Sequence, residues 1–154
     1  MRIDETDRRI LHELQVDARR PNTELAVAAN VSPSTVVNRL RHLEQSGVIR
    51  GYHADVEDAA LHRNVQALVS IKLRPKTPAH VDAFLDAVWS FDETVAVWLV
   101  TGEYDALVQL SARDMATLSQ AVLTSIGGAP NVVDERTSVV FQHRTKRVLV
   151  TLHG

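Results

Sequence analysis

The stretch SPSTVVNRLRHLEQSGVIRGY at residues 32–52 predicts one short helix with well-defined ends. Ser32 suits the N-cap position, and Pro33 suits the first helical position, where its missing N–H group costs nothing. Gly47 can adopt the left-handed conformation that ends many helices. We therefore expect a helix from Pro33 to about Ser46.

The two faces of this expected helix differ in chemistry. One face carries apolar side chains at helical spacing, namely Val36, Leu40 and Leu43, with Val37 at the edge. The opposite face carries Ser34, Thr35, Asn38, Arg41 and His42. It holds no carboxylate, and base edges and phosphates favour Asn, Arg, Ser and Thr side chains. From this helix alone, DNA contact and an ordinary solvated surface are equally good interpretations.

The overall composition limits the classes of protein. The chain has 154 residues, with 19 acidic and 17 basic side chains, which allows one average domain or two small ones. A net charge of -2 argues against indiscriminate coating of nucleic acid but leaves room for a local basic patch. No apolar run approaches the ~20 residues of a membrane span, and the N-terminus lacks a signal-peptide core, so we expect a cytoplasmic protein without membrane insertion. The lack of cysteine excludes disulfides, thiolate nucleophiles and thiolate-bound zinc.

Two further helices are expected before the opening stretch. Residues 4–17 place acidic side chains in a first turn and apolar ones along one side. Asn22 or Thr23 can cap a short second helix, and Asn30 suits a left-handed end. Two short helices joined by a few residues and preceded by a supporting helix are the pattern of a helix-turn-helix unit. A three-helix bundle with no nucleic-acid role is the alternative.

The second part of the chain is rich in β-forming residues. It follows an extended stretch at 48–54 and a polar linker at 55–64. Hydrophobic spacing then predicts a strand, a helix, two strands, a helix and a strand, at residues 65–73, 81–88, 94–101, 104–110, 115–126 and 132–141. This order is typical of the ferredoxin-like βαββαβ fold, with residues 148–152 left over as a strand-like arm. We expect an α+β protein with domains at residues 1–60 and 61–154.

The strand expected at residues 94–101 is apolar on both faces. Val95, Val97 and Leu99 alternate with Ala96, Trp98 and Val100. One face can cover the helices of its own domain, and the other face then needs a different cover. In a chain of this length, a second subunit is the expected source of that cover.

Four stretches together carry a family resemblance. They are DETDRRILHELQVDARRPNTELA, VSPSTVVNRLRHLEQSGVIRGYHA, VTGEYDALVQL and VDERTSVVF, beginning at residues 4, 31, 100 and 133. In this order they resemble the leucine-responsive/asparagine (Lrp/AsnC, feast/famine) family of bacterial and archaeal transcription regulators, over nearly the whole chain. The resemblance implies an N-terminal winged-type helix-turn-helix domain and a C-terminal ferredoxin-like domain for effector binding and oligomerisation. It also implies homodimers, often assembled into octamers, and an amino-acid effector bound at a contact between dimers.

For double-stranded DNA, we expect the helix from Pro33 to Glu44 to enter a major groove. Side chains near base edges would be Ser34, Thr35, Asn38 and His42, with Ser32 at the helix start. Phosphate contacts would come from Arg39, Arg41 and Arg50. A dimer would place two such helices about one helical turn of DNA apart, or a multiple of it, on a roughly palindromic site.

The expected effector site centres on the family's ligand loop, which the resemblance places at Val100, Thr101, Gly102, Glu103, Tyr104 and Asp105. A zwitterionic amino acid needs donors for its carboxylate, which backbone N–H groups in a Gly-containing turn supply, and acceptors for its ammonium, such as Asp105 or a carbonyl. Thr137 matches a family position near that pocket. Glu135 stands where some relatives carry a hydroxyl, so it either favours a basic ligand side chain or points to solvent. From the residues alone, a bare β-turn is the preferred interpretation of the loop.

Other chemistries find little support in the sequence. The seven histidines lack a spacing typical of metal ligands, so we expect no metal site, and no cofactor beyond an amino-acid effector. No catalytic residues are expected, because no carboxylate pair, phosphate-binding Gly loop or nucleophile elbow stands out. The enzyme alternative is a siroheme-decarboxylase-like protein of the same architecture, which would use Arg50, His53 and Tyr104. An amino-acid-binding module with a vestigial helix-turn-helix is a third possibility.

Overall fold

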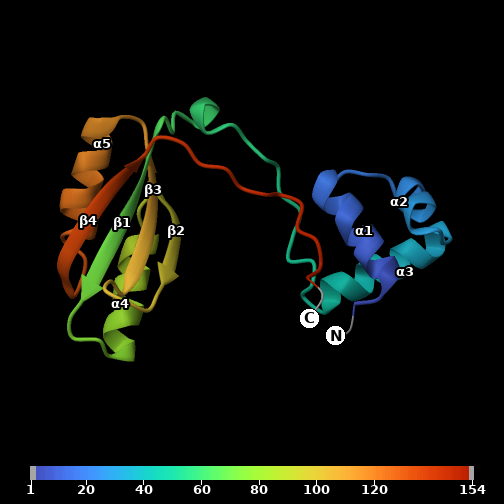
Figure 1. Cartoon of the computed structure of the whole chain (residues 1–154), viewed down its shortest axis with the longest axis horizontal. Helices are drawn as coiled ribbons and strands as arrows, with labels where there is room; N and C mark the ends of the chain where they lie inside the picture. Colours follow the sequence, from blue (N-terminus) through green and yellow to red (C-terminus); the bar gives the residue numbers. More distant parts are fainter. Residues whose placement is uncertain (1–2, 153–154) are drawn as a thin grey trace. The chain divides into compact units, whose positions relative to one another are not determined.

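The first compact unit of the protein is a bundle of three helices (Figure 1). The computed structural model describes residues 3–152. In this unit the helices are α1 (Glu5–Val16), α2 (Asn22–Ala29) and α3 (Pro33–Gln45). Their order and bounds confirm the helix-turn-helix expected from the sequence, with α2 and α3 separated by a short turn.

The ends of these helices follow from specific residues. Asp4 caps α1 and forms a capping box with Asp7, because each carboxylate accepts the other's backbone N–H, at 2.8 and 3.1 Å. Ser32 caps α3 and accepts a hydrogen bond from the Thr35 N–H group at 3.2 Å. Asn30 takes the expected left-handed conformation. Helix α2 differs from expectation, since it begins at Asn22 itself and Pro21 is its N-cap without a side-chain hydrogen bond.

A small apolar core holds the three helices together. Ile10 of α1, Leu25 of α2 and Val36 of α3 are fully buried against one another. Ala26 and Ala29 belong to the same cluster, and their small side chains let neighbouring helices approach closely. The apolar face predicted for α3 is therefore its core face.

The second compact unit, Val56–His143, is built on a four-stranded antiparallel sheet. The strand order is β2-β3-β1-β4, and two connecting helices lie against one face (Figure 1). This is the predicted βαββαβ arrangement. The elements are the 3₁₀ turn η1 (Asp58–Leu61), β1 (Val65–Leu73), α4 (Pro78–Trp89), β2 (Thr94–Leu99), β3 (Ala106–Ala112), α5 (Met115–Gln120), its π-helical continuation η2 (Ala121–Ile126) and β4 (Val132–Val140).

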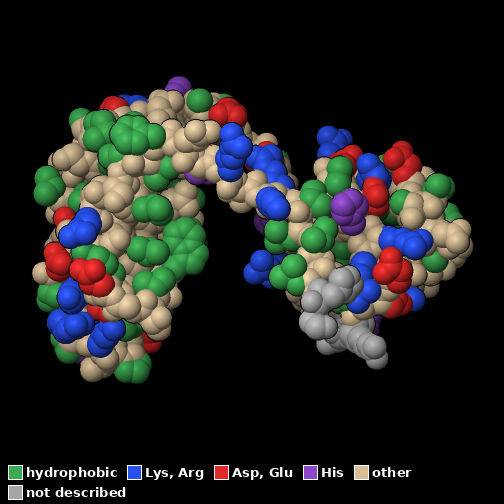
Figure 2. Space-filling view, viewed as in Figure 1, with side chains coloured by type: hydrophobic (Ala, Val, Ile, Leu, Met, Phe, Trp, Pro, Cys, Tyr) green, Lys and Arg blue, Asp and Glu red, His purple; other side chains and the backbone are tan. Residues whose placement is uncertain are grey.

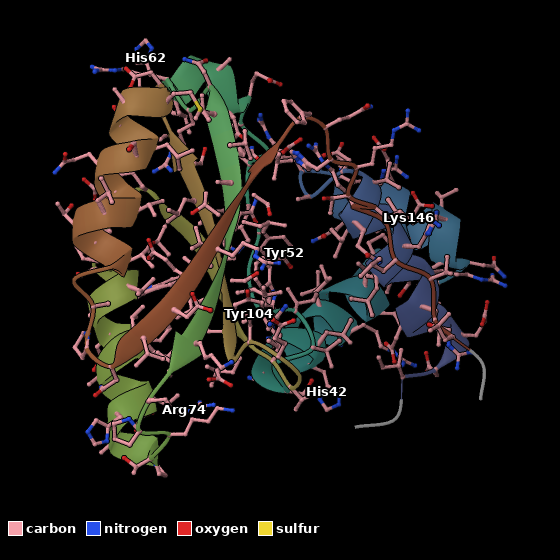
Figure 3. The ribbon with its side chains drawn as sticks, turned by 60° about the vertical axis from the view of Figure 1, so that its left-hand side comes forward. His42, Tyr52, His62, Arg74, Tyr104 and Lys146 are labelled. Carbon is pink, nitrogen blue, oxygen red and sulfur yellow. The ribbon has the colours of Figure 1, made fainter. Side chains whose placement is uncertain are left out.

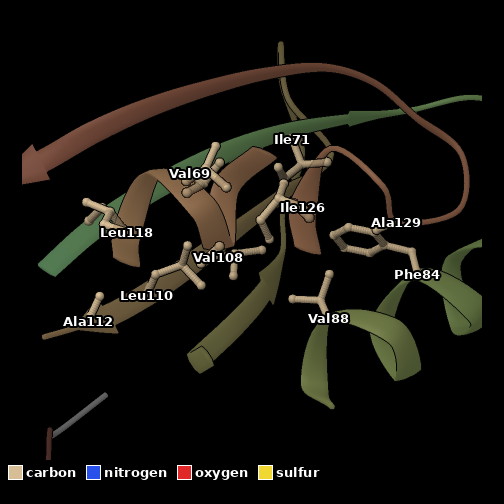
Figure 4. Packing of buried hydrophobic residues seen from close by; sticks show 14 of the residues in the cluster. Val69, Ile71, Phe84, Val88, Val108, Leu110, Ala112, Leu118, Ile126 and Ala129 are labelled. Atoms are coloured by element: carbon tan, nitrogen blue, oxygen red, sulfur yellow. The ribbon is translucent and has the colours of Figure 1, made fainter. Parts of the chain in front are cut away.

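The two faces of this sheet have different surroundings. The face toward the helices is sealed by a large apolar core, which Figure 4 shows around Val69, Val108, Phe84 and Ile126. The open face carries Leu68 and Trp98, whose side chains are exposed. The sequence-based expectation that one face of β2 lacks a cover within its own subunit agrees with this arrangement.

Two expected extended segments form no strands in the described residues. Residues 48–54 make no ladder with another strand, although the N–H groups of Val48 and Ile49 donate to the Leu43 carbonyl and close the end of α3. The strand expected at residues 148–152 was wrong for the part that the structure describes. Its apolar alternation has no neighbouring strand edge to pair with, and Leu149 instead bonds to a side chain of α1.

The chain crosses between the two units twice. The first unit comprises Met1–Asp55 together with Arg144–Gly154, and the second comprises Val56–His143. The predicted domain boundary between residues 60 and 61 stays a prediction. The division into compact units places the first crossing between residues 55 and 56. Sequence periodicity does not reveal that the C-terminal residues belong with the helices.

Candidate DNA-binding surface and ligand cleft

One stripe of α3 is exposed and polar. Ser34, Asn38, Arg41 and His42 are all exposed, and their spacing puts them on one side of the helix. The Arg41 guanidinium donates to the Asn38 side-chain oxygen at 3.5 Å. Figure 3 labels His42 on this helix. The structure thus brings four of the predicted DNA contacts together on a surface that can face a groove.

Arg39 has a different environment from the other predicted contacts. Its guanidinium pairs with Asp4 and lies 3.1 Å from a carboxylate oxygen of Asp7. Asp7 is only 2% exposed, so this pair joins α3 to the start of α1. The hydrogen bond that Arg39 donates to Asp4 raises the pKa of Arg39, and the Asp7 N–H and Arg39 lower the pKa of Asp4. Arg39 therefore holds α3 against the start of α1, and its phosphate contact stays a prediction.

The remaining predicted DNA contacts lie at the two ends of α3: Ser32 and Thr35 at its start, and Arg50 beyond its end. The Ser32 hydroxyl is engaged in capping and lies 2.9 and 2.8 Å from the hydroxyls of Ser34 and Thr35. Ser32 and Thr35 therefore shape the start of α3 and present it, while Ser34 is the most available of the three. Arg50 is exposed beyond the end of α3.

In the second unit, the hairpin between β2 and β3 is fixed by Asp105. The Asp105 carboxylate accepts the Leu73 N–H at 2.9 Å and an Arg74 N–H at 3.1 Å, and it forms an ion pair with Lys76. Asp105 is only 5% exposed. Its backbone also bonds to both neighbours, since its N–H donates to Ile71 and its carbonyl accepts from Val100.

These contacts decide the ionisation of Asp105. Burial opposes ionisation, but the hydrogen bonds from Lys76 and the Leu73 N–H outweigh it and lower the pKa of Asp105. The carboxylate is therefore charged and fully engaged by its own chain. The expectation that Asp105 serves as a ready acceptor for a ligand ammonium is not supported by this geometry; Asp105 anchors the hairpin instead.

A cleft of about 430 Å³ opens beside this anchor. Its size lies within the usual range for small-molecule sites (~300–1,000 Å³). Lys76, Asp82 and Asp105 contribute charges, and the remaining lining is mostly apolar: Leu73, Thr77, Pro78, Val81, Leu99 and Val100. Thr101, Gly102 and Glu103 form the exposed tip of the hairpin, where Gly102 has a φ of 129° that L side chains rarely adopt.

Glu135 and Thr137 lie elsewhere in the same unit. Both are on β4, opposite Ile71 and Val69 of β1, and neither lines the cleft. One carboxylate oxygen of Glu135 is buried without a hydrogen-bond partner among the described residues. Burial and the nearby Asp134 raise the pKa of Glu135. Within one copy of the chain, the structure therefore separates these two predicted ligand residues from the cleft.

One contact does connect the hairpin with β4. The Arg136 guanidinium lies over the Tyr104 ring, 5.9 Å from its centroid. Figure 3 labels Tyr104 and Arg74 at this end of the sheet.

Sequence reasoning missed the residues that complete the cleft. Arg74 and Lys76 flank a proline immediately after β1, and nothing in their local pattern marks them as partners of a residue some thirty positions later. The signal that could have found them is topological. In a βαββαβ sheet β1 lies beside β3, so the end of β1 meets the start of β3.

Neither a metal centre nor a membrane segment emerges from the part of the chain that the structure describes. No group of three or more potential ligands gathers there, and no described helix has the length and apolarity to span a bilayer. His153, one of the seven scattered histidines, lies outside the described residues.

The sequence and the fold match known proteins over almost the whole chain. Residues 3–44 match the AsnC-type helix-turn-helix domain, and residues 66–149 match the Lrp/AsnC ligand binding domain. The HTH-type transcriptional regulator AldR of Mycolicibacterium smegmatis is 33% identical over 141 residues, which cover 92% of this chain and 82% of that protein. The leucine-responsive regulatory protein of Escherichia coli K12 is 34% identical over 140 residues, covering 91% and 85%.

Solved structures give the same picture. A transcriptional regulator of Neisseria meningitidis, solved as a complex with L-Met, superposes with a TM-score of 0.89 at 30% identity and covers 96% of both chains. Escherichia coli AsnC superposes with a TM-score of 0.85 at 29% identity, covering 96% of this chain and 99% of that one.

A helix-turn-helix unit joined to a ligand-binding unit defines a class of DNA-binding transcriptional regulators. This chain belongs to the Lrp/AsnC family within that class, as the resemblance predicted. Its relatives are named as regulators and not as enzymes, which favours regulation over the siroheme-decarboxylase alternative.

Proposed function

We propose that this regulator binds specific DNA sites and that a free amino acid changes its DNA binding or its oligomeric state. The observation that carries the effector part is the cleft beside the Asp105-anchored hairpin. It combines the half-exposed ammonium of Lys76 with a mostly apolar wall. An amino acid can pair its carboxylate with the Lys76 ammonium and pack an aliphatic side chain against the apolar wall.

The chemistry of the cleft favours an effector with an apolar side chain. Leu73, Val81 and Leu99 would contact that side chain, while backbone carbonyls would accept from its ammonium in place of Asp105. The Neisseria regulator's complex with L-Met supports this choice. A basic effector is the competing choice, and it requires a second copy of the chain to bring Glu135 to the hairpin.

Oligomerisation is part of the proposal. The exposed side chains of Leu68 and Trp98 on the open sheet face fit a second copy of the same sheet, which would give a homodimer. Further assembly to octamers would place ligand sites at contacts between dimers. The DNA it regulates makes the cytoplasm its place of action.

The DNA part is tested with the full chain and a duplex selected from a random library. Asn38→Ala should cost ~1–3 kcal/mol if Asn38 makes a bidentate base contact, and it should relax sequence preference. Arg41→Gln should instead lower the salt dependence of binding, because one phosphate is no longer neutralised. The control is Gln120→Ala, which removes a polar side chain from an exposed helix position in the other unit. Unchanged binding by both α3 variants would contradict the assignment.

The effector part is tested by genomic footprinting with and without a panel of free amino acids, together with calorimetric titration of the pure protein. We expect binding of apolar amino acids and a changed footprint or oligomeric state. Lys76→Met should weaken binding about tenfold or more, and Arg113→Gln should leave it unchanged as a control of equal charge. A Soret absorption band without DNA affinity would favour the enzyme alternative. Effector binding without specific DNA retention would favour the module with a vestigial helix-turn-helix.

A further inference from the structure

The C-terminal segment, residues 144–152, is attached to the helix-turn-helix unit by specific contacts. The Gln15 side chain of α1 accepts the Leu149 N–H at 2.8 Å and donates to the Leu149 carbonyl at 3.2 Å. Arg147 forms an ion pair with Asp55 in the chain that leaves α3. Val148 is half-buried. An amide that pairs with both backbone groups of one residue fixes the direction of the segment as well as its position.

An open pocket of about 380 Å³ lies between this segment and α1. Leu149, Val150 and Thr151 form one wall, and Leu11 and His12 contribute to the other. The segment is therefore held at one residue and one ion pair and is not packed along its whole length. Its basic side chains remain in solvent.

The attached C-terminal segment changes the net charge of the helical unit. Residues 1–55 contain eight Lys and Arg against eight Asp and Glu, so the helices and their linker are neutral in sum. Residues 56–143 contain eleven acids and six bases. Residues 144–154 add Arg144, Lys146 and Arg147 with no acid. The unit that must approach a polyanion obtains its net positive charge from the far end of the chain.

Several cations of the first fifty-five residues are also already paired. Arg8 and Arg9 pair with Glu5, Arg20 pairs with Glu13, and Arg39 pairs with Asp4 and Asp7. By contrast, Arg144 and Lys146 are exposed and make no ion pair within residues 3–152. Figure 3 labels Lys146 on this segment, and Figure 2 shows basic side chains where the chain enters and leaves the helical unit.

We propose that the C-terminal segment is an accessory DNA-binding element, in which Arg144 and Lys146 contact backbone phosphates beside the groove that α3 enters. The proposal rests on the DNA-binding function of α3. Extended arms contribute phosphate and minor-groove contacts in other helix-turn-helix proteins, and such contacts add affinity without reading sequence. The ion pair of Arg147 with Asp55 and the bonds from Gln15 hold the segment in place for this contact.

The test is a salt titration of DNA binding by the full chain, with a labelled duplex of mixed sequence and with the selected duplex. Each of Arg144→Gln and Lys146→Gln should lower the slope of log K against log salt by about 0.9 for each phosphate that is no longer neutralised. Affinity should fall several-fold at low salt for both duplexes, with their ratio unchanged. Arg113→Gln, which removes an exposed positive charge from the other unit, is the control for net charge.

A variant that changes no charge tests whether the segment must be attached to α1 in order to contribute to DNA binding. Gln15→Ala removes both hydrogen bonds to Leu149 without changing any charge, and it should also lower the slope. Slopes equal to that of the unaltered protein for the two basic-residue variants would overturn the proposal, as would an unchanged slope for Gln15→Ala. A fall that Arg113→Gln reproduces would also overturn it, because net charge alone would then explain the effect. An unaltered protein without DNA affinity would overturn the function of α3 itself.

Discussion

Each unit of this regulator contains one buried aspartate that positions its functional element. Asp7 in the helical unit is 2% exposed and receives Arg39 from α3. Asp105 in the sheet unit is 5% exposed and receives Arg74 and Lys76 from the end of β1. In both cases a carboxylate accepts a backbone N–H and pairs with a partly exposed cation, one at Asp7 and two at Asp105. One pair positions α3, and the other positions the hairpin between β2 and β3.

The two aspartates differ in what else supports them. Asp105 lies beside a large core built around Phe84, Val108 and Ile126. Asp7 lies beside a small core around Ile10, Leu25 and Val36, so polar links carry a larger share of the stability there. The same chemical change should therefore damage the helical unit more than the sheet unit. Both tryptophans, Trp89 and Trp98, belong to the sheet unit, which allows the two units to be followed separately.

Asp7→Ala should have the largest effect. It removes half of the capping box and leaves Arg39 with a single partner, which should lower the free energy of unfolding of the helical unit by about 2–4 kcal/mol. Denaturation followed by far-ultraviolet circular dichroism should show an early helical transition. Tryptophan fluorescence should report an unchanged transition for the sheet unit, and a joint shift of both signals would contradict the independence of the two units.

Asp105→Ala should destabilise the sheet unit and leave the helical unit unchanged, and the loss of stability should be smaller than that caused by Asp7→Ala. The Leu73 N–H and two cations lose their acceptor, at a cost of about 1–3 kcal/mol that the surrounding core limits. Tryptophan fluorescence should now shift while the helical transition stays in place. Calorimetric titration should also show weaker amino-acid binding, because the hairpin is no longer fixed; full retention of binding would show that the hairpin does not shape the cleft.

Asp105 also predicts a dependence on pH. Its pKa in the folded protein is lowered below the ordinary 3.8, so its stabilising contribution is present above that value and is lost as the pH falls through the folded pKa. Asp105→Asn lacks this titration. The stability of its sheet unit should therefore fall less steeply than that of the unaltered protein below about pH 4, as measured by tryptophan fluorescence in urea at several pH values. Equal slopes would argue that Asp105 is not ionised in the folded unit.

Glu135→Gln should have the smallest effect and the opposite sign. Burial and Asp134 raise the pKa of Glu135 above its ordinary 4.5, so keeping this carboxyl ionised at neutral pH lowers the stability of the folded protein. The amide should stabilise the sheet unit by about 0.5 kcal/mol or less at pH 7. The gain should vanish well below pH 4.5, where the native carboxyl is protonated; a gain that persists there would have a cause other than charge.

The sequence predicted local structure well because caps and periodicity are local. Ser32, Pro33 and Asn30 take the positions expected from their backbone preferences, and the strand at 65–73 has the predicted bounds. The stripe of Ser34 and Asn38 was predictable for the same reason.

Local sequence did not reveal partners that are distant in the chain. Arg39 and Asp105 carry charges that suit ligands, and no local pattern reveals that Asp7 and Lys76 already satisfy them. The segment at 148–152 alternates like a strand, but a strand needs an edge to pair with, and its neighbour is a helix. Where a charge goes and which surface a segment meets depend on the fold, which local sequence does not specify.

The return of residues 144–152 to the helical unit means that the chain crosses between the two compact units at both ends of the sheet unit. A single proteolytic cut at the first crossing would therefore leave the C-terminal segment joined to the sheet unit by the backbone, and to the helical unit only through non-covalent contacts such as those of Gln15 of α1.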